Sequence, residues 1–151
     1  MRFIADEMLG KLARWLRMAG LDVAYQRSIG DEQLLHRAGE EERILLTRDT
    51  RLIRRCPEPR YFFITQDHLP EQLRELFRHF PELKGQLSPL SRCVECNQPL
   101  VPIPRDQVRG KVWPYVYETQ ENFTTCPECH RIFWEATHVA RIKEKLRRLL
   151  P

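Results

Sequence analysis

The stretch Ile44-Leu45-Leu46-Thr47-Arg48-Asp49, which reads ILLTRD, decides the fold that the sequence predicts. Four residues suited to a buried strand run directly into an aspartate. Two more stretches are built in the same way: Phe3-Ile4-Ala5 leads to Asp6, and Tyr61 to Thr65 leads through Gln66 to Asp67. Three expected strands therefore deliver an acid at their carboxyl ends.

Helical patterns separate the expected strands. Apolar residues recur at the spacing of one helix face, and a basic segment follows Asp49. The expected helices cover residues 9–16, 31–38, 50–55 and 70–80, and a further short strand covers 23–25. Gly20 is suited to end the first helix and Pro70 to begin the last. Alternating strands and helices predict an α/β domain with a mostly parallel central sheet over residues 1–83.

The composition changes after Pro81. Residues 84–92, KGQLSPLSR, read as a linker. Residues 93–151 are expected to form a second, smaller unit with two cysteine pairs and short aromatic strands, one of them at 112–117. A basic C-terminal helix closes this unit. Its apolar stripe consists of Val139, Ile142, Leu146 and Leu149.

Two C-x-x-C pairs, Cys93 with Cys96 and Cys126 with Cys129, carry the strongest chemical signal. Each short loop sets two thiolates at the angle that tetrahedral zinc requires, and the metal then ties the two loops together. The segment between the pairs is long enough for a hairpin, so the sequence predicts a small zinc-ribbon domain. Because a four-sulfur site has no open coordination position, this zinc is expected to be structural and not catalytic.

The second cysteine pair also allows another interpretation. Cys126 to His130 reads CPECH, the pattern that attaches c-type haem. Such attachment needs export, whereas the stretch MRFIADEMLG holds two acids and lacks the apolar run of a secretory signal. The first cysteine pair would also be left without a role. We therefore expect zinc, with His130 as a neighbour of the metal and not a ligand, in a cytoplasmic protein.

The aspartates that follow the expected strands are candidates for a second metal centre. In an open α/β sheet, ligands bind beyond the carboxyl ends of the strands. Asp6, Asp49 and Asp67 could converge there, joined by Asp31 at the start of the second helix. Clustered carboxylates repel one another unless a cation neutralises them, and oxygen ligands suit Mg²⁺ or Mn²⁺. Each of these acids also suits helix capping, so both roles stay open.

Basic residues near these acids are candidates for holding substrate phosphates. They are Arg14, Arg17, Arg48 and Arg51. The chain carries 25 Lys and Arg against 21 Asp and Glu, a net charge of +4. Contact with phosphates and an ordinary solvated surface both agree with this charge, and with the basic last helix. The aromatic residues of the second unit are expected to pack around the ribbon, although exposed ones would suit base stacking. These residues are Trp113, Tyr115, Tyr117 and Trp134.

In combination, several sequence blocks resemble one known family. They are DEMLGKLARWLR at 6–17 with Gly20, Asp31 with Leu34-Leu35, and LLTRD at 45–49, followed in order by the two cysteine pairs. This pattern resembles the Mut-seven C-terminal RNase domain family over essentially the whole chain. The resemblance implies a PIN-like domain with a zinc ribbon fused at its C-terminal side.

The resemblance also implies an activity, that of a metal-dependent ribonuclease. Carried onto this chain, Asp6, Asp31 and Asp49 would hold Mg²⁺ or Mn²⁺, with Asp67 as a fourth acid, and the adjacent Glu32 leaves the helix position open. The expected partner is single-stranded RNA. No apolar run is long enough to span a membrane, and the oligomeric state stays open. The alternative is a non-catalytic RNA-binding or ribosome-associated module, whose sequence mark would be a broken acid set.

Overall fold

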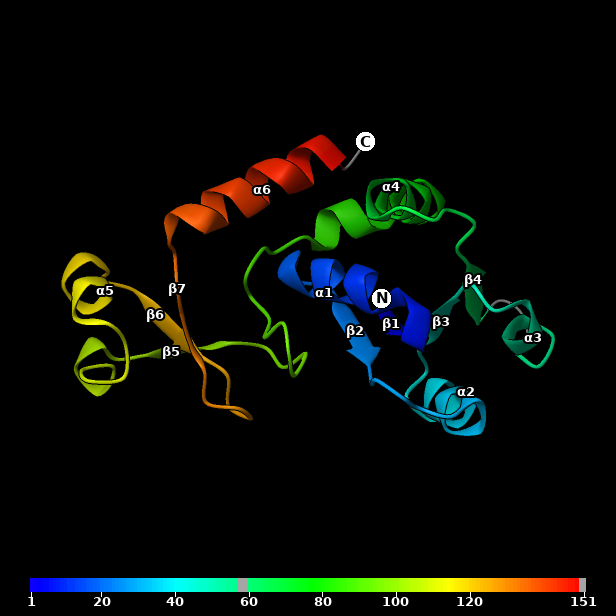
Figure 1. Ribbon diagram of the computed structural model, residues 1–151, viewed down its shortest axis with the longest axis horizontal. Helices are drawn as coiled ribbons and strands as arrows, with labels where there is room; N and C mark the ends of the chain where they lie inside the picture. Colours follow the sequence, from blue (N-terminus) through cyan, green and yellow to red (C-terminus); the bar gives the residue numbers. More distant parts are fainter. Residues whose placement is uncertain (57–59, 150–151) are drawn as a thin grey trace.

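In residues 1–56 and 60–149, which a computed structural model describes, the chain forms two β-sheets (Figure 1). The larger sheet is parallel, with its strands in the order β2-β1-β3-β4. These strands are β1 (Arg2–Ala5), β2 (Asp22–Tyr25), β3 (Ile44–Thr47) and β4 (Tyr61–Phe63). Ala5 pairs with Tyr25 on one side and with Leu46 on the other, so the carboxyl ends of these strands meet at one edge. The predicted parallel sheet is confirmed.

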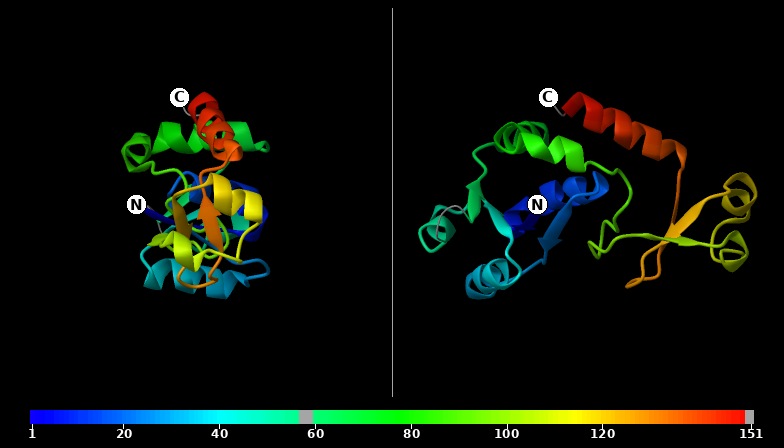
Figure 2. Two further views of the ribbon diagram at one scale, coloured as in Figure 1. Left: turned by 90° about the vertical axis from the view of Figure 1, so that its left-hand side faces the viewer. Right: turned by 180° about the vertical axis from the view of Figure 1, so that it is seen from behind.

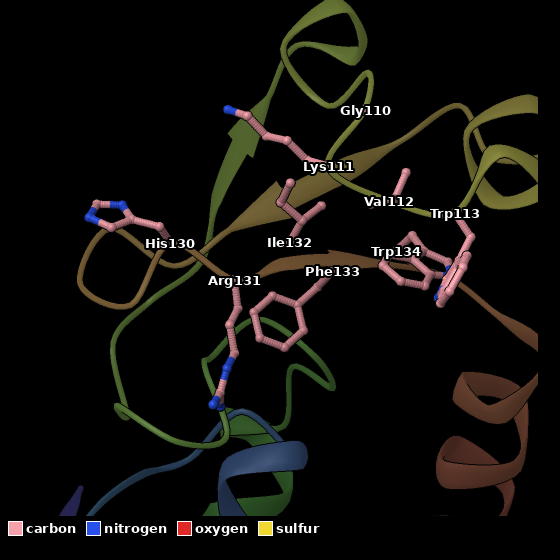
Figure 3. A pocket seen from close by; sticks show the side chains of 9 residues that line it. All are labelled: Gly110, Lys111, Val112, Trp113, His130, Arg131, Ile132, Phe133 and Trp134. Atoms are coloured by element: carbon pink, nitrogen blue, oxygen red, sulfur yellow. The ribbon is translucent and has the colours of Figure 1, made fainter.

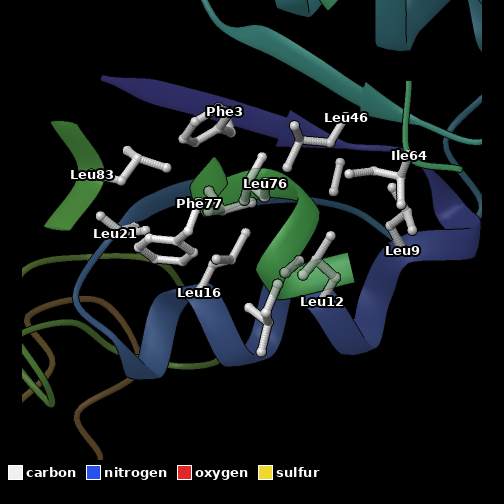
Figure 4. Packing of buried hydrophobic residues seen from close by; sticks show 14 of the residues in the cluster. Phe3, Leu9, Leu12, Leu16, Leu21, Leu46, Ile64, Leu76, Phe77 and Leu83 are labelled. Atoms are coloured by element: carbon white, nitrogen blue, oxygen red, sulfur yellow. The ribbon is translucent and has the colours of Figure 1, made fainter. Parts of the chain in front are cut away.

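Helices cover both faces of the parallel sheet because its strands are apolar on both sides. The helices α1 (Gly10–Met18) and α4 (Leu69–His79) pack on one face, and α2 (Asp31–Glu40) and the short α3 (Thr50–Ile53) pack on the other. Figure 4 shows the larger of the two cores, in which apolar side chains of α1 and α4 meet those of β1 and β3.

The second unit contains an antiparallel sheet in the order β5-β6-β7. Its elements are β5 (Val101–Ile103), the 3₁₀ helix η3 (Arg105–Gln107), α5 (Pro114–Thr119), β6 (Phe123–Thr125) and β7 (Ile132–Trp134). The strand expected at 112–117 is wrong, because α5 occupies most of that segment. Pro114 stands in the first turn of α5, where its fixed φ favours a helix. Trp113 and Tyr115 are 79% and 74% exposed, so no buried face supports a strand there.

The segment expected to be a linker packs against the end of α1. It begins inside the 3₁₀ helix η2 (Pro81–Gln86). Further along, the backbone N–H of Ser88 donates to the carbonyl of Ala19 at 3.0 Å, and that of Leu90 donates to Met18 at 3.0 Å. Gly20 has a φ of +91°, and a Cβ there would lie 2.2 Å from the carbonyl oxygen of Ser88. The crossing from the first unit to the second is therefore held in place by backbone contacts.

The last helix, α6 (Thr137–Leu149), leaves the antiparallel sheet and returns to the first unit, where it contacts α4 (Figures 1 and 2). Leu149 joins the core that α1 and α4 form, and the Lys145 ammonium lies 4.7 Å from the centroid of the Trp15 ring. Val139, Leu146 and Leu149 are buried, as the predicted apolar stripe requires. Within the described parts of the chain, no helix combines the length and the apolar character needed to cross a membrane.

Candidate metal centres and the acidic edge of the sheet

The four cysteines form one compact cluster at the beginning of the second unit. Their sulfur atoms all lie within 4.8 Å of one another, and Cys93 Sγ is 3.8 Å from Cys129 Sγ. Zinc bound tetrahedrally at about 2.3 Å would hold its sulfurs about 3.8 Å apart, so this spacing fits a zinc ion. The cluster is compatible with structural zinc, and the unit around it, residues 93–136, is consistent with a zinc ribbon. It is called the ribbon below.

Local backbone geometry directs the sulfurs inward. The N–H of Cys96 donates to Cys93 Sγ, and the N–H of Cys129 donates to Cys126 Sγ, each at 3.5 Å. The residue after each pair, Asn97 or His130, turns the chain with a φ near +60°. His130 thus serves the turn and lies outside the cluster of four thiols.

The thiols differ in their readiness to ionise. The backbone N–H of Arg131 is the largest influence on Cys129 and lowers its pKa to about 7, whereas burial raises the pKa of Cys96 to about 12. Four close thiolates repel one another, and a divalent cation relieves that repulsion. The donor set therefore favours occupation by a metal.

Arg17 joins the first cysteine pair to the parallel sheet. Its side chain is 6% exposed, and its Nη1 donates at 2.8 Å to the carbonyls of both Val94 and Glu95. Its Nε donates at 2.8 Å to the carbonyl of Val23 in β2. Burial lowers the pKa of this guanidinium, and nearby acidic groups oppose that shift. Arg14, one turn earlier, pairs with the Glu95 carboxylate at 2.7 Å.

The positions of Arg14 and Arg17 correct the expectation that they lie beside the aspartates. The helix α1 starts at the carboxyl edge of the sheet and runs back toward the start of β2. Its nine residues span about 14 Å. Arg17 therefore lies near the opposite edge of the sheet, where ribbon carbonyls take up its donors. In the structure these two arginines contact the first cysteine loop of the ribbon.

The four candidate aspartates follow the parallel strands or begin the next helix at the carboxyl edge, here called the acidic edge. The chain leaves β1 toward β2 on one side and leaves β3 toward β4 on the other, so the strand order reverses between β1 and β3. This switch point is the usual ligand-binding position of such sheets. Asp6 follows β1 and Asp49 follows β3, so these two acids flank it.

Asp6 is the most deeply placed of the four, with only 4% of its surface exposed. Its carboxylate accepts hydrogen bonds from the backbone N–H of Met8 and of Arg48, each at 3.0 Å, and from the hydroxyl of Thr47. The first of these bonds makes Asp6 the N-cap of the 3₁₀ helix η1 (Glu7–Leu9). The predicted capping role is real, and the other two bonds tie Asp6 to the end of β3.

Asp49 also caps a helix and is linked to Asp6 through one side chain. It accepts a hydrogen bond from the N–H of Arg51 at 2.8 Å, and this bond is the main reason why the pKa of Asp49 is lowered. Its own N–H donates to Thr47 Oγ1 at 2.9 Å. Because Thr47 Oγ1 donates to Asp6, the hydroxyl bridges the two aspartates.

The remaining acids of the edge are exposed and paired with arginines. Asp31 and Glu32 lie in the first turn of α2, where Arg55 donates to Glu32 and its Nη1 lies 4.0 Å from Asp31 Oδ2. Asp67 is paired with the guanidinium of Arg48, which also donates to the carbonyl of Gln66. The fourth candidate arginine, Arg51, is 3.5 Å from Asp49 and is largely exposed.

Among the residues that the structure describes, the four cysteines are the single group of three or more His, Cys, Asp and Glu close enough to hold an ion. Asp6, Asp31 and Asp49 share an edge, but their carboxylate oxygens are not close enough together to form such a group. Mg²⁺, however, is commonly held by one or two carboxylates, with waters and substrate phosphates completing its shell. Asp6 and Asp49, which flank the switch point, are the candidates for that smaller requirement.

Sequence reasoning missed two residues of this edge, Thr47 and Arg55. Thr47 is fully buried and joins Asp6 to Asp49. A hydroxyl at the last position of an apolar strand, two residues before an acid, was its available signal. Arg55 contacts both Asp31 and Glu32 from a different element, and no local pattern indicates that pairing.

The fold and these two groups of side chains define a class: an α/β protein with an acidic carboxyl edge, joined to a unit with a four-cysteine cluster that is compatible with zinc. The family model described as the Mut7-C RNAse domain matches residues 1–146, and the chain belongs to this family. The resemblance drawn from the sequence is therefore confirmed. Comparisons with curated proteins and with solved structures find no match. The family description indicates a ribonuclease, a hydrolase whose substrate is RNA.

Proposed function

We propose that this chain is a divalent-cation-dependent ribonuclease that hydrolyses RNA phosphodiester bonds at the acidic edge, in a PIN-like domain whose ribbon holds structural zinc. One observation carries the proposal: two aspartates flank the switch point of the sheet, bridged by Thr47, in a member of a ribonuclease family. The family supplies the class of reaction, and the edge supplies the acids.

The acceptor capacity of Asp6 supports a cation there. A carboxylate offers about four lone-pair positions, and three donors reach Asp6. The three hydrogen bonds thus fix the position of the Asp6 carboxylate, and one lone-pair position remains for a cation. Asp49 keeps its charge across neutral pH, since its pKa is lowered. Hard oxygen donors of this kind suit Mg²⁺ or Mn²⁺.

The residues divide the work as follows. Asp6 and Asp49 would hold the cation, and Asp31 would approach it from the start of α2. When bound, such a cation lowers the pKa of a water and stabilises the charge that develops on the phosphodiester. Thr47 fixes the orientation of Asp6, and the backbone N–H of Arg48 does the same. Arg48 and Arg51, which lie at this edge, would meet RNA phosphates.

Cleavage of a 5′-labelled single-stranded RNA tests the proposal, with Mn²⁺ added or left out. The informative variant is Asp49→Asn, because asparagine caps a helix about as well as aspartate but lacks its charge. We expect cleavage by the wild-type protein only with the cation, and a loss of about 100-fold or more in the variant. Asp106→Asn, an exposed acid of the ribbon, is the matched control. Circular dichroism and zinc content verify folding.

Two other outcomes have defined meanings. Equal cleavage by wild-type protein and Asp49→Asn would reduce Asp49 to a helix cap and point to a contaminant. Folded wild-type protein that retains RNA without cutting it would establish the non-catalytic RNA-binding module. A specific observation keeps that second function open, namely that the acids of the edge already have capping and ion-pair roles.

A further inference from the structure

The ribbon carries a pocket of about 560 Å³ that the acidic edge does not use (Figure 3). One wall of the pocket is the segment 110–113. The other wall is the segment 130–134, which follows the second cysteine pair and includes β7. Its lining residues are Gly110, Lys111, Val112, Trp113, His130, Arg131, Ile132, Phe133 and Trp134. This composition combines aromatic and basic side chains.

The charge of this pocket has one sign. Its charged lining residues are Lys111 and Arg131, and it has no Asp or Glu among the described residues. Arg131 has an acidic neighbour outside the pocket, since its Nη1 lies 3.7 Å from Glu95. Lys111 is exposed, and its ammonium has no ion pair within residues 1–56 and 60–149. A polyanion is therefore the complementary ligand.

The aromatic side chains are placed as a platform. Trp113 is 79% exposed at the end of the segment 110–113, where it buries little surface of its own. The Trp134 ring packs edge-to-face against the ring of Phe123, and the two centroids are 6.4 Å apart. In Figure 3 the two tryptophans lie toward one end of the pocket, and Lys111 and His130 lie toward the other. Exposed aromatic rings beside basic groups are how proteins hold unpaired bases and their phosphates.

We propose that this pocket binds a segment of single-stranded RNA, with a base stacked on Trp113 beside Trp134 and the phosphates beside Lys111 and His130. The choice of RNA rests on the proposed function, whereas stacking and charge come from the pocket itself. Duplex RNA fits less well, because its bases are already stacked and its edges are hidden. Trp113 therefore acts as a base-stacking residue, and not as the packing residue that the sequence suggests.

The pocket is a site separate from the acidic edge. The ribbon is fastened to the first unit through Arg17, near the start of β2 and away from the carboxyl ends of the strands. A bound RNA would be anchored on the ribbon while another part of it reaches the acids. This arrangement predicts that RNA long enough to reach both places binds more tightly than RNA that fills one of them.

Binding of a fluorescein-labelled single-stranded RNA 20-mer to the full chain, measured by fluorescence anisotropy, tests the pocket. The Asp49→Asn background prevents cleavage during the measurement. Trp113→Ala is the test variant, and Tyr115→Ala is its matched control, because Tyr115 is 74% exposed and does not line the pocket. Lys111→Ala is compared in the same way with Lys84→Ala, an exposed lysine of η2.

We expect Trp113→Ala to weaken binding about 5- to 140-fold, the range that stacking of one base gives at 1.4 kcal/mol per tenfold. Tyr115→Ala should stay within about twofold. Lys111→Ala should lower the slope of affinity against salt concentration by about one, as loss of one phosphate contact does. Duplex RNA of the same sequence should be insensitive to Trp113→Ala.

Other results would overturn the inference and separate it from the nuclease proposal. Equal affinities of Trp113→Ala and Tyr115→Ala, or equal losses on duplex and single strands, would exclude stacking in this pocket. Cleavage by wild-type protein combined with either result would leave the nuclease proposal standing and the pocket refuted. If binding depends on Trp113 but the wild-type chain never cleaves RNA, the pocket is supported and the nuclease proposal is refuted.

Discussion

The guanidinium of Arg17 in α1 donates to the main-chain carbonyl of Val94, inside the first cysteine loop, at 2.8 Å. The same side chain also holds Glu95 of that loop and Val23 of β2. A buried side chain of the first unit thus fixes the metal loop of the second. Three carbonyls accept hydrogen bonds from this one residue.

Arg17→Lys should destabilise the protein by about 2–3 kcal/mol, because an ammonium cannot reach carbonyls in both directions and a buried acceptor loses its partner. Urea unfolding followed by circular dichroism measures the loss. Arg14→Lys is the matched control, since the Arg14–Glu95 pair is about half exposed and should contribute less than about 1 kcal/mol. Equal shifts for the two variants would contradict the role assigned to Arg17.

The purified chain should contain one zinc ion, and Cys126→Ser should remove it. Loss of the metal leaves the two cysteine loops unconnected, so the ribbon should lose its tertiary structure. The hydrogen bonds from Arg17 to Val94 and Glu95 should be lost with it. Zinc content by atomic absorption and near-ultraviolet circular dichroism report these two events. Cys56→Ser is the control, because Cys56 lies in the core beneath α2 and outside the cluster. A zinc content that Cys126→Ser leaves unchanged would refute the four-cysteine site.

Asp22, at the end of β2 that contacts Asn97 of the ribbon, should make the contact between the two units sensitive to acid. Burial would raise the pKa of this carboxyl, but hydrogen bonds from Arg43 and Asn97 outweigh burial and place it below its ordinary 3.8. A depressed pKa contributes stability that is present above the unfolded value and is lost as pH falls through the folded value. Wild-type stability should therefore decline below about pH 4 more steeply than that of Asp22→Asn.

Urea titrations at pH 6, 4 and 3 give the free energy of unfolding of each protein, and therefore its slope against pH. Asn97 also accepts from the N–H of Val23 at 3.0 Å, so Asp22→Asn leaves one bond across this contact in place. Asp106→Asn, at an exposed position, should follow the wild-type curve. If Asp22→Asn keeps the wild-type slope, Asp22 does not carry the acid sensitivity.

Gly20→Ala should cost about 2 kcal/mol or more, because the new Cβ would enter a left-handed conformation and meet the backbone of Ser88 at 2.2 Å. The midpoint of thermal unfolding measures this cost. Gly85→Ala serves as the comparison, since nothing lies within 4 Å of a Cβ there. A smaller loss for Gly20→Ala than for Gly85→Ala would show that the segment after η2 moves away freely.

Asp31 and Glu32 can be told apart by paired variants. Glu32 is 85% exposed and is bound directly by Arg55, whereas the Asp31 oxygen stands 4.0 Å from that arginine. Asp31→Asn should therefore raise the Mn²⁺ concentration needed for half-maximal cleavage about 10-fold or more, the size of effect seen for residues that support a metal site. Glu32→Gln should change that concentration little. A Mn²⁺ titration of cleavage rates measures both. The opposite ranking would assign the helix position to Glu32.

Short-range patterns determined most of the parallel domain. The strand that begins ILLTRD, the two strands like it and the intervening helices all formed, with β4 and α3 two residues shorter than predicted, because apolar periodicity sets which face of each element can be buried. The cysteine spacing likewise predicted a four-sulfur cluster, since each C-x-x-C loop brings its two sulfurs together locally. At 112–117 the aromatic pattern failed, because Pro114 begins a helix whose neighbouring aromatic rings stay exposed.

The sequence by itself thus determined most elements of the parallel domain, the acids that follow its strands and the four clustered cysteines. Only the tertiary structure decided which partners the charged and aromatic side chains have. It placed Arg14 and Arg17 against the ribbon, gave Arg48 to Asp67, and left Trp113 open beside Lys111. The physical reason is range. Periodicity and capping act within a few residues, whereas the hydrogen-bond partners of these arginines come from separate elements, across the two units for Arg14 and Arg17 and within the first unit for Arg48.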